Sequence, residues 1–274
     1  MDFATRPAGL AKGEWGKLLV LAGSERFSGA AVLTVMGALR TGLDLVVAAA
    51  PARAADAVLA AAPDAVTLRL EGGEFAPEHV GDLDYFRDYP VAIGSGLTTE
   101  HGAKRFLKAV LEEFSGPFVI DADALTLLAD ESDGTWYDGS DKSVVLTPNA
   151  EEYAALAAAN DSGDARSGSV ARTIGETAKQ YGAVILAKGE TDVIGDGKTV
   201  IEVEGGSSYL AKAGTGDVLT GAVGAFLARG FSPLEAAKAG AELVKEAGER
   251  AEKDRGPALL ASDLPGYFDA RRIG

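Results

Sequence analysis

The 274-residue chain contains no cysteine and only two histidines, His79 and His101. Without thiols it can form neither disulfides nor thiolate metal sites, and two imidazoles supply too few ligands for a zinc centre. We therefore expect any metal to be a hard, oxygen-bound cation that arrives with a ligand, as Mg2+ does with a nucleotide.

Basic residues and long apolar runs are also scarce. The sequence has 26 Lys and Arg against 41 Asp and Glu, which gives a net charge of -15. Nucleic-acid binding relies on clustered Lys and Arg, so no nucleic-acid partner is expected. No apolar run approaches the roughly 20 residues that span a bilayer, and the first 16 residues lack the apolar core of a signal peptide. We expect a cytoplasmic protein with no membrane partner. Whether its acidic surface is an adaptation to high salt stays open.

Seven short apolar runs are present, and they are too continuous for strands that face water on one side. Between most of them lie stretches with helical spacing, such as Val32, Val35, Met36 and Leu39. Alternation of this kind predicts an α/β fold with a mainly parallel central sheet and helices on both faces, in three αβα layers. The runs span 17–23, 43–49, 65–70, 90–94, 117–122, 143–147 and 183–189.

The pattern changes after the seventh run. Residues 191–205 read as two strands around Asp196 and Gly197, which predicts a hairpin. Helical stretches follow, one of them opened by Ser232, Pro233 and Glu235, the pattern of a capping box. The polar stretch 160–169 predicts a surface loop. With no linker and no internal repeat, residues 1–274 are predicted to form a single domain.

Glycines and acids gather directly after five of the predicted strands. The carboxyl ends of parallel strands meet at one rim of the sheet, where ligands of such folds bind. Each motif by itself is compatible with an ordinary turn, but their shared position indicates a ligand site. The motifs are AGSERFSGA (22–30), GSGLT (94–98), DADAL (121–125), TPNAEE (147–152) and KGETD (188–192).

The stretch AGTGD (213–217) carries the most specific chemistry. The backbone amides of Gly214, Thr215 and Gly216 lead into a predicted helix and would present donors to an anion. Such an anion hole suits phosphoryl transfer. Asp217 could then accept a proton from an attacking hydroxyl. The alternative for this stretch is an ordinary helix cap.

Extended to AGTGDVLTG (213–221), the motif resembles the signature of the ADP- or ATP-dependent NAD(P)H-hydrate dehydratases of the ribokinase-like superfamily. The opening segment 12–46 is similar to that family's, and VIDADAL, LTPNAEEYAAL and LAKGETDVI follow in the family's order. The resemblance runs from about Lys12 to Leu264. It implies a ribokinase-like fold in which a nucleotide phosphorylates the ring hydroxyl of hydrated NADH or NADPH. Loss of phosphate then restores the C=C bond.

The resemblance also implies roles for individual residues. Asp217 matches the catalytic base, and Gly214, Thr215 and Gly216 the anion hole. ADP or ATP and Mg2+ are the implied cofactors. Asp121, Asp123 and Glu152 are candidate metal residues. Capping of the following helix explains the two aspartates equally well, and a surface position in the first turn of a helix explains the glutamate equally well. The implied substrate residues are Ala30, Gly96, Asn149 and Asp217; the implied nucleotide residues are Lys188, Gly189, Glu190, Thr191, Asp192 and Gly216.

One position departs from the family pattern, because Asn149 stands where a substrate-contacting histidine is expected. Asparagine forms hydrogen bonds but takes no proton near pH 7. It also favours an alternative, a ribokinase-like kinase for a hydroxymethylpyrimidine or hydroxyethylthiazole. A second alternative is a nucleotide-binding protein without turnover. The sequence leaves the choice of ADP or ATP open. We further expect a homo-oligomer, and no epimerase domain on this chain; a separate protein could supply that activity.

Overall fold

The computed structural model describes residues 6–130, 142–158 and 170–269, so the loop predicted at 160–169 lies outside the described residues. In these ranges one nine-stranded sheet has the order β3-β2-β1-β4-β5-β6-β7-β8-β9. The strands are β1 (Lys17–Leu21), β2 (Leu45–Pro51), β3 (Val66–Leu70), β4 (Val91–Ile93), β5 (Phe118–Ile120), β6 (Val144–Leu146), β7 (Val184–Ala187), β8 (Asp192–Gly195) and β9 (Val200–Val203).

The strand directions agree with the sequence pattern. β1 to β7 pair in parallel, and each lies within one of the seven apolar runs, apart from β2, which extends two residues further. The predicted hairpin is confirmed, because β7, β8 and β9 pair antiparallel. Asp196 Oδ1 closes its turn by accepting bonds from the amides of Lys198 and Thr199, at 2.8 and 2.7 Å.

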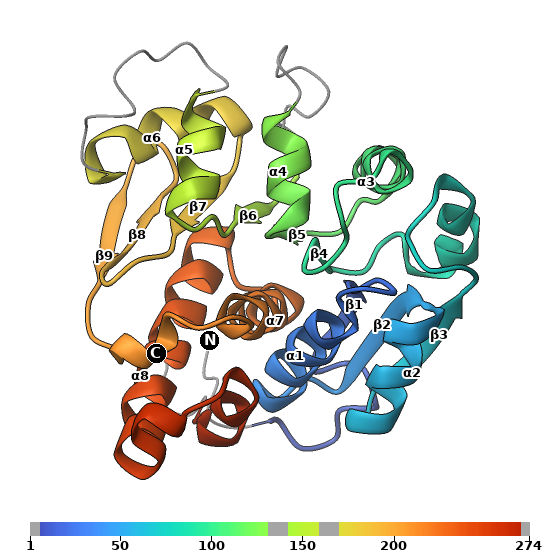
Figure 1. The fold of residues 1–274 in the computed structure, drawn as a ribbon, viewed down its shortest axis with the longest axis horizontal. Coiled ribbons are helices and arrows are strands. Elements are labelled where there is room, and N and C mark those ends of the chain that lie inside the picture. Colours follow the sequence, from blue (N-terminus) through green and yellow to red (C-terminus); the bar gives the residue numbers. More distant parts are fainter. Residues whose placement is uncertain (1–5, 131–141, 159–169, 270–274) are drawn as a thin grey trace.

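Helices cover both faces of the sheet, which confirms the predicted three layers (Figure 1). α1, α2, α7 and α8 pack on one face. α3, α4, α5, α6 and the 3-10 helix η1 pack on the other. The helices are α1 (Ser28–Arg40), α2 (Ala52–Ala61), α3 (His101–Glu113), α4 (Asp123–Ala129), α5 (Ala150–Ala158), α6 (Val170–Tyr181), α7 (Thr215–Ala228) and α8 (Pro233–Arg255), with 3-10 segments η1 (Pro77–Phe86), η2 (Ser208–Leu210), η3 (Gly256–Ala258) and η4 (Ala261–Tyr267).

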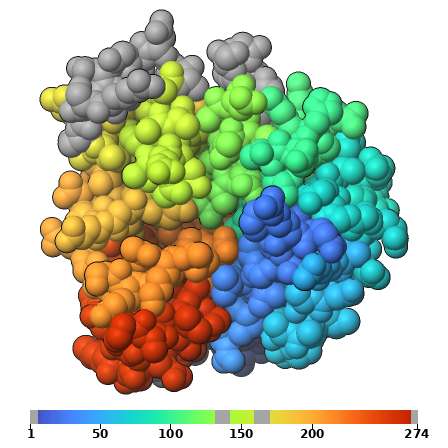
Figure 2. All heavy atoms as spheres, in the orientation of Figure 1, coloured from blue at the N-terminus to red at the C-terminus, as the bar shows by residue number. Residues whose placement is uncertain are grey.

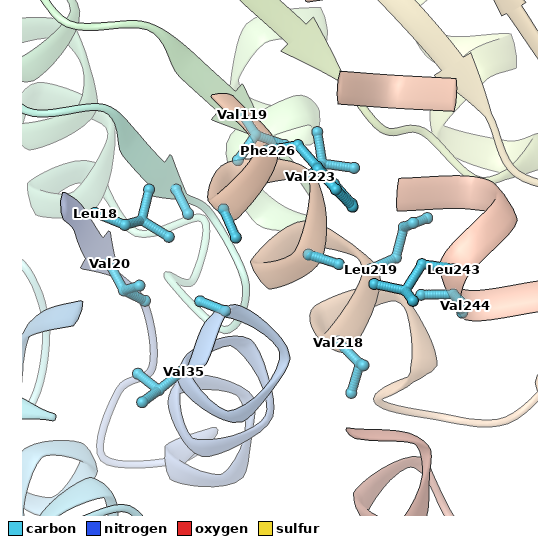
Figure 3. Packing of buried hydrophobic residues seen from close by; sticks show 14 of the residues in the cluster. Leu18, Val20, Val35, Val119, Val218, Leu219, Val223, Phe226, Leu243 and Val244 are labelled. Atoms are coloured by element: carbon cyan, nitrogen blue, oxygen red, sulfur yellow. The ribbon is translucent and has the colours of Figure 1, made fainter. Parts of the chain in front are cut away.

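α7 is the central helix of its layer. It packs between α1 and α8, and the last third of the chain therefore lies against the first, as Figure 2 shows where the orange and red surface meets the blue. Ten consecutive residues of α7, from Val218 to Leu227, are buried. Side chains from β1, β5, α1 and α8 surround it (Figure 3). α8 begins with the predicted capping box of Ser232 and Glu235. Burial on all sides fixes the start of α7 relative to the sheet.

Replacing Gly221 by alanine should strongly destabilise the protein. α1 and α7 cross where a Cβ on Gly221 would overlap the backbone oxygen of Thr34. Backbone cannot yield as a side chain can, so we expect a loss of about 3 kcal/mol in the free energy of unfolding. Gly224→Ala is the matched control, since its Cβ would meet only flexible Leu18 and Val119 atoms at 3.1 Å or more. Chemical denaturation of both variants tests this; equal stability would contradict it.

The strand order reverses between β1 and β4, which are neighbours in the sheet. The loops that follow these strands meet at this point, where the Gly23 amide donates to the Ser95 oxygen at 2.8 Å. A crevice at the carboxyl ends of such strands is the usual ligand site of open α/β sheets. Within the described ranges, no helix has both the length and the apolarity needed to cross a bilayer.

Candidate active site

The start of α7 is built by the glycine-rich turn. Gly214 adopts a left-handed conformation at φ 91°, which glycine reaches without steric cost. Thr215 Oγ1 donates to the oxygens of Leu210 and Lys212, at 2.7 and 3.0 Å, and so fixes the entry of the chain. The Thr215 amide makes a long bond of 3.4 Å to the Lys212 oxygen. The amides of Gly216 and Asp217 lie in the first helical turn, where no preceding helical carbonyl is available, so they can face an anion.

Asp217 lies in this first turn and is partly buried. Burial, and then the negative charge of Asp121, raise the pKa of the Asp217 carboxyl to about 7. Lys188 and the Ser95 hydroxyl act in the opposite direction. The Ser95 hydroxyl is close enough to act on Asp217, yet this buried group forms no hydrogen bond within the described residues. A carboxyl with a pKa near 7 can both accept and release a proton near neutral pH.

Asp121 is buried and joins four segments. Its Oδ1 accepts bonds from Thr147 Oγ1 at 2.9 Å and from Lys188 Nζ at 2.7 Å. Its Oδ2 accepts a bond from Thr220 Oγ1 of α7 at 2.8 Å. Both carboxylate oxygens are therefore engaged by protein groups that come from the ends of β6 and β7 and from α7.

Lys188 brings a positive charge to the amide turn. A Cβ on Gly216 would lie 3.2 Å from Lys188 Nζ, so the absence of a side chain there leaves the ammonium accessible. Burial lowers the pKa of Lys188, but Asp121 and Glu152 outweigh burial and raise it above its ordinary value. Glu152 Oε2 lies 3.9 Å from Nζ. The site thus holds an ammonium, whose protonated form its acidic neighbours favour, beside the candidate anion hole.

Asn149 and Glu152 cap α5. Asn149 Oδ1 accepts bonds from the amides of Glu151 and Glu152, at 2.9 and 3.0 Å. Glu152 Oε2 accepts the Asn149 amide at 2.7 Å. Burial raises the pKa of the Glu152 carboxyl, although Lys188 opposes the shift. The side-chain oxygen of Asn149 caps the helix, and among the described residues its side-chain nitrogen makes no hydrogen bond.

A pocket of about 1060 Å³ opens beside the amide turn. This volume lies at the upper end of ordinary ligand sites and accommodates a nucleotide. All five residues of the KGETD motif line it, together with Asn149, Thr215 and Gly216. The rest of its wall comes from residues 204–208, Leu210, Ala211, Lys212, Leu219, Val244 and Lys245.

Ala30 and Gly96 do not line this pocket. They lie next to each other where the loops after β1 and β4 meet. Gly96 has φ 67°, and a Cβ there would lie 3.0 Å from the Ala30 Cβ and 2.8 Å from the Phe27 Cβ. Ser95, one residue before Gly96, acts on Asp217. The predicted residues thus form two groups, one that lines the pocket and one where the loops after β1 and β4 meet. Gly216 belongs to the first group, and Asp217, the next residue, is affected by Ser95 beside the second.

Asp123 holds the loop after β4. Its Oδ2 accepts the amide of Thr98 at 2.8 Å, and Thr98 has φ 71°, which is uncommon for a β-branched residue. The Thr98 hydroxyl donates to Glu74 Oε2 at 3.0 Å. Burial raises the pKa of the Asp123 carboxyl. Asp123 therefore stabilises a strained turn of the crevice.

The acidic residues of the site do not form a metal cage of their own. In the part of the chain that the structure describes, no three His, Cys, Asp or Glu side chains are arranged to hold a metal ion. Both oxygens of Asp121 are already engaged. Mg2+ commonly binds through phosphates, waters and one or two carboxylates. Glu152, whose Oε2 lies 3.9 Å from Lys188 Nζ, is the candidate for such a carboxylate.

Three further residues of the site carry no motif in the sequence. Lys245 and Glu249 lie on α8 and contact the loops that line the pocket. Lys212 lines the pocket and donates through Nζ to the oxygens of Pro257 and Leu259, at 2.8 and 2.6 Å. A lysine in an amphipathic helix usually lies on the surface, so the local sequence does not predict that Lys245 is buried.

Known proteins with similar sequences indicate the family of this chain. The profile of a family described as NAD(P)H-hydrate dehydratase matches residues 18–268. The chain is 41% identical over 271 residues to a bifunctional NAD(P)H-hydrate repair enzyme of Pyrobaculum aerophilum, covering 96% of this chain and 52% of that protein. It is 35% identical over 260 residues to an ADP-dependent (S)-NAD(P)H-hydrate dehydratase of Cenarchaeum symbiosum, covering 92% and 87%.

A solved structure gives the same result. The ADP/ATP-dependent NAD(P)H-hydrate dehydratase of Bacillus subtilis, co-crystallised with ATP and Mg2+, superposes with a TM-score of 0.76 at 28% identity, covering 98% of this chain and 92% of that one. The chain spans about half the length of the bifunctional relative. The family profile nevertheless covers nearly all of this sequence. The chain therefore belongs to the NAD(P)H-hydrate dehydratase family.

Proposed function

We propose that this protein uses an adenine nucleotide to dehydrate hydrated NADH or NADPH, and so returns the damaged cofactor to its active form. The observation that carries the proposal is the position of Asp217. Its carboxyl lies in the first turn of α7, next to Gly216, which lines the pocket together with the KGETD motif, and Ser95 of the loop after β4 is close enough to affect it. A phosphoryl donor and an alcohol acceptor can meet there, with a proton acceptor beside them.

The donor belongs in the pocket. Lys188, Gly189, Glu190, Thr191, Asp192 and Gly216 line it, and we assign them to the nucleotide. The relatives named ADP-dependent and ADP/ATP-dependent support an adenine nucleotide without deciding between the two. Glu152, with the nucleotide phosphates, would hold Mg2+, which when bound supplies charge neutralisation for the phosphates.

We assign the acceptor to the place where the loops after β1 and β4 meet and where Ala30 and Gly96 lie next to each other. The side-chain amide of Asn149 can donate to a substrate oxygen, whereas its own Oδ1 caps α5. Asp217 then lies beside the ring hydroxyl.

The first half-reaction is phosphoryl transfer. The ring hydroxyl oxygen attacks the terminal phosphorus of the nucleotide, and its proton passes to Asp217. The bond from phosphorus to the bridging oxygen breaks, so the nucleotide leaves one phosphate shorter. The amides of the turn 214–216 and the Lys188 ammonium offset the charge that develops on the transferred group.

The second half-reaction is elimination. The ring nitrogen lone pair forms a C=N bond as the C–O bond breaks, and phosphate leaves with that electron pair. Loss of a proton from the neighbouring carbon then gives the C=C bond of NADH or NADPH. Free phosphate and the shortened nucleotide are the other products, and no oxidation occurs.

Three further properties concern the whole protein. We expect residues 1–274 to fold as a single domain, the protein to work in the cytoplasm and copies of the chain to form a homo-oligomer. Light scattering coupled to size-exclusion chromatography measures the oligomeric state directly.

The test is recovery of the near-ultraviolet absorbance of NADH. Purified protein is mixed with Mg2+, chemically hydrated NADH and either ADP or ATP, and phosphate release is measured in parallel. We expect the NADH band to return with one phosphate released for each NADH formed. Reactions without nucleotide, or with EDTA in excess over Mg2+, should show no recovery.

The products also separate the alternatives. A small-molecule kinase would consume nucleotide with a hydroxymethylpyrimidine or hydroxyethylthiazole and release no phosphate. A nucleotide-binding protein without turnover would bind ADP or ATP and restore no NADH. Folded protein that restores no NADH with either nucleotide, at low or high salt, would refute the dehydratase.

A further inference from the structure

The middle of α8 carries a buried charge. Lys245 is only 6% exposed, and lysine is almost never buried unless its ammonium is paired. It lies among apolar α8 residues that face the sheet, such as Leu243 and Val244. A charge at such a place costs free energy unless hydrogen bonds offset it.

Its ammonium binds two separate loops. Nζ donates to the oxygen of Glu190 at 2.7 Å and, more weakly, to those of Gly205 and Gly189 at 3.3 and 3.4 Å. Asp192 Oδ2 lies 3.7 Å away. An ammonium has three N–H donors, and here all three are directed at protein carbonyls. Lys245 therefore has no donor left for a ligand.

The same two loops are tied a second time. Asp192 Oδ1 accepts the Gly189 amide at 2.9 Å, which closes the KGETD turn. Glu249, one turn after Lys245, accepts the Gly206 amide at 2.9 Å. The loop 188–192 and the loop 204–208 both line the pocket. Lys245 and Glu249 of α8 thus bind both of them.

We propose that Lys245 is a positioning residue for the nucleotide, which sets the spacing between the two loops of the pocket. This inference rests on the proposed function, since it takes the pocket to be the nucleotide site. A ligand binds more tightly to a pocket wall that is already ordered, because less conformational entropy is lost on binding. Lys245 lines the pocket, but its ammonium is engaged by the two loops, so its loss should weaken nucleotide binding mainly through their spacing.

The test uses Lys245→Met, which keeps the length of the side chain and removes its donors. Calorimetry measures the Kd for ADP and ATP, and steady-state kinetics measure KM for the nucleotide and for hydrated NADH. We expect nucleotide Kd and KM to rise about tenfold or more, with the KM for hydrated NADH within about twofold. A purely structural role would lower the amount of active protein and kcat instead.

Lys238→Met is the matched control. Lys238 lies on the same helix with a side chain that is 44% exposed, and it pairs only with Glu242 among the described residues. It should bind nucleotide as the wild type does. Lys245→Arg should restore part of the affinity, because a planar guanidinium keeps the charge but fits the three carbonyls less well.

Glu249→Ala covers the case in which Lys245→Met does not fold. Glu249 is exposed, and its loss frees only the 204–208 loop, so we expect a Kd about threefold higher. Wild-type affinity in a folded Lys245→Met, or in Glu249→Ala if the first variant is unfolded, would overturn the inference. Wild-type protein that binds neither ADP nor ATP would instead overturn the proposed function.

Discussion

Replacing Asp217 by asparagine is expected to lower the dehydratase rate by about a thousandfold and, at the same time, to make the folded protein more stable at pH 8. The rate falls because an amide cannot accept the proton of the ring hydroxyl. The amide turn and Lys188 stay in place, so nucleotide binding should be retained. Few substitutions change activity and stability in opposite directions by this much.

The gain in stability follows from the raised pKa of Asp217. Its carboxyl has a pKa of about 7 in the folded protein against 3.8 for the free group. Such a group stabilises the folded state only while it is protonated there, and its contribution is lost as the pH rises toward 7. A difference of about three pKa units corresponds to a ceiling of about 4 kcal/mol, and partial exposure reduces it to about 2 kcal/mol.

Thermal unfolding at several pH values measures this effect. We expect Asp217→Asn to raise Tm by about 4 °C at pH 8 and to leave it unchanged near pH 4, where the wild-type carboxyl is protonated in the folded state. Asp254→Asn, a surface change on α8, should show no such difference. A variant that loses both activity and stability at pH 8 would contradict this prediction. It would show that the ionised Asp217 carboxyl stabilises the fold.

The second large effect is expected for Asp121→Asn. This change removes the charge that pairs with Lys188 and leaves this partly buried ammonium without its main partner. We expect the free energy of unfolding to fall by about 3 kcal/mol. The negative charge of Asp121 also raises the pKa of Asp217, so its removal should lower that pKa. Because the base acts when it is deprotonated, the acidic limb of the rate profile should move to lower pH.

The position of the limb is read from kcat/KM as a function of pH, independently of the height of the profile. Asp123→Asn is the control. Asp123 also acts on Asp217, but more weakly than Asp121, and its oxygen binds the Thr98 amide away from Lys188. It should move the limb less and leave Lys188 paired. An acidic limb that stays in place or moves to higher pH in Asp121→Asn would contradict the proposed influence of Asp121 on the base.

The fold was predictable because each element has a local signal. The apolar runs of β1 and β4 to β7 are short and continuous, which only strands covered on both faces require. The Asp196–Gly197 turn marks the antiparallel pair of β8 and β9, and the sheet becomes antiparallel one strand earlier, between β7 and β8. The order of strands in the sheet has no such signal, because it depends on contacts between segments far apart in the chain.

The candidate site was predictable only where a local motif marks a residue. Motifs at strand ends pointed to Ala30, Gly96 and Asn149 on one rim of the sheet, and AGTGD pointed to Asp217 at the start of a helix. In the structure Asn149 lines the pocket, whereas Ala30 lies beside Gly96 where the loops after β1 and β4 meet. Their individual roles stay predictions. The capping role of Asn149 had a local signal in the spacing of Asn149 and Glu152. The bonds of Asp121 to Lys188 and Thr220 had none, because they join residues 67 and 99 positions apart.

The antiparallel hairpin of β8 and β9 has a consequence for how such an enzyme can change. It forms one edge of the sheet, and the loops at its ends line the pocket that we assign to the phosphoryl donor. The loops that we assign to the acceptor follow β1 and β4 in the interior of the sheet, where a backbone change disturbs strands on both sides. On this assignment, mutation at the periphery can change the choice of nucleotide while recognition of the acceptor is inherited unchanged.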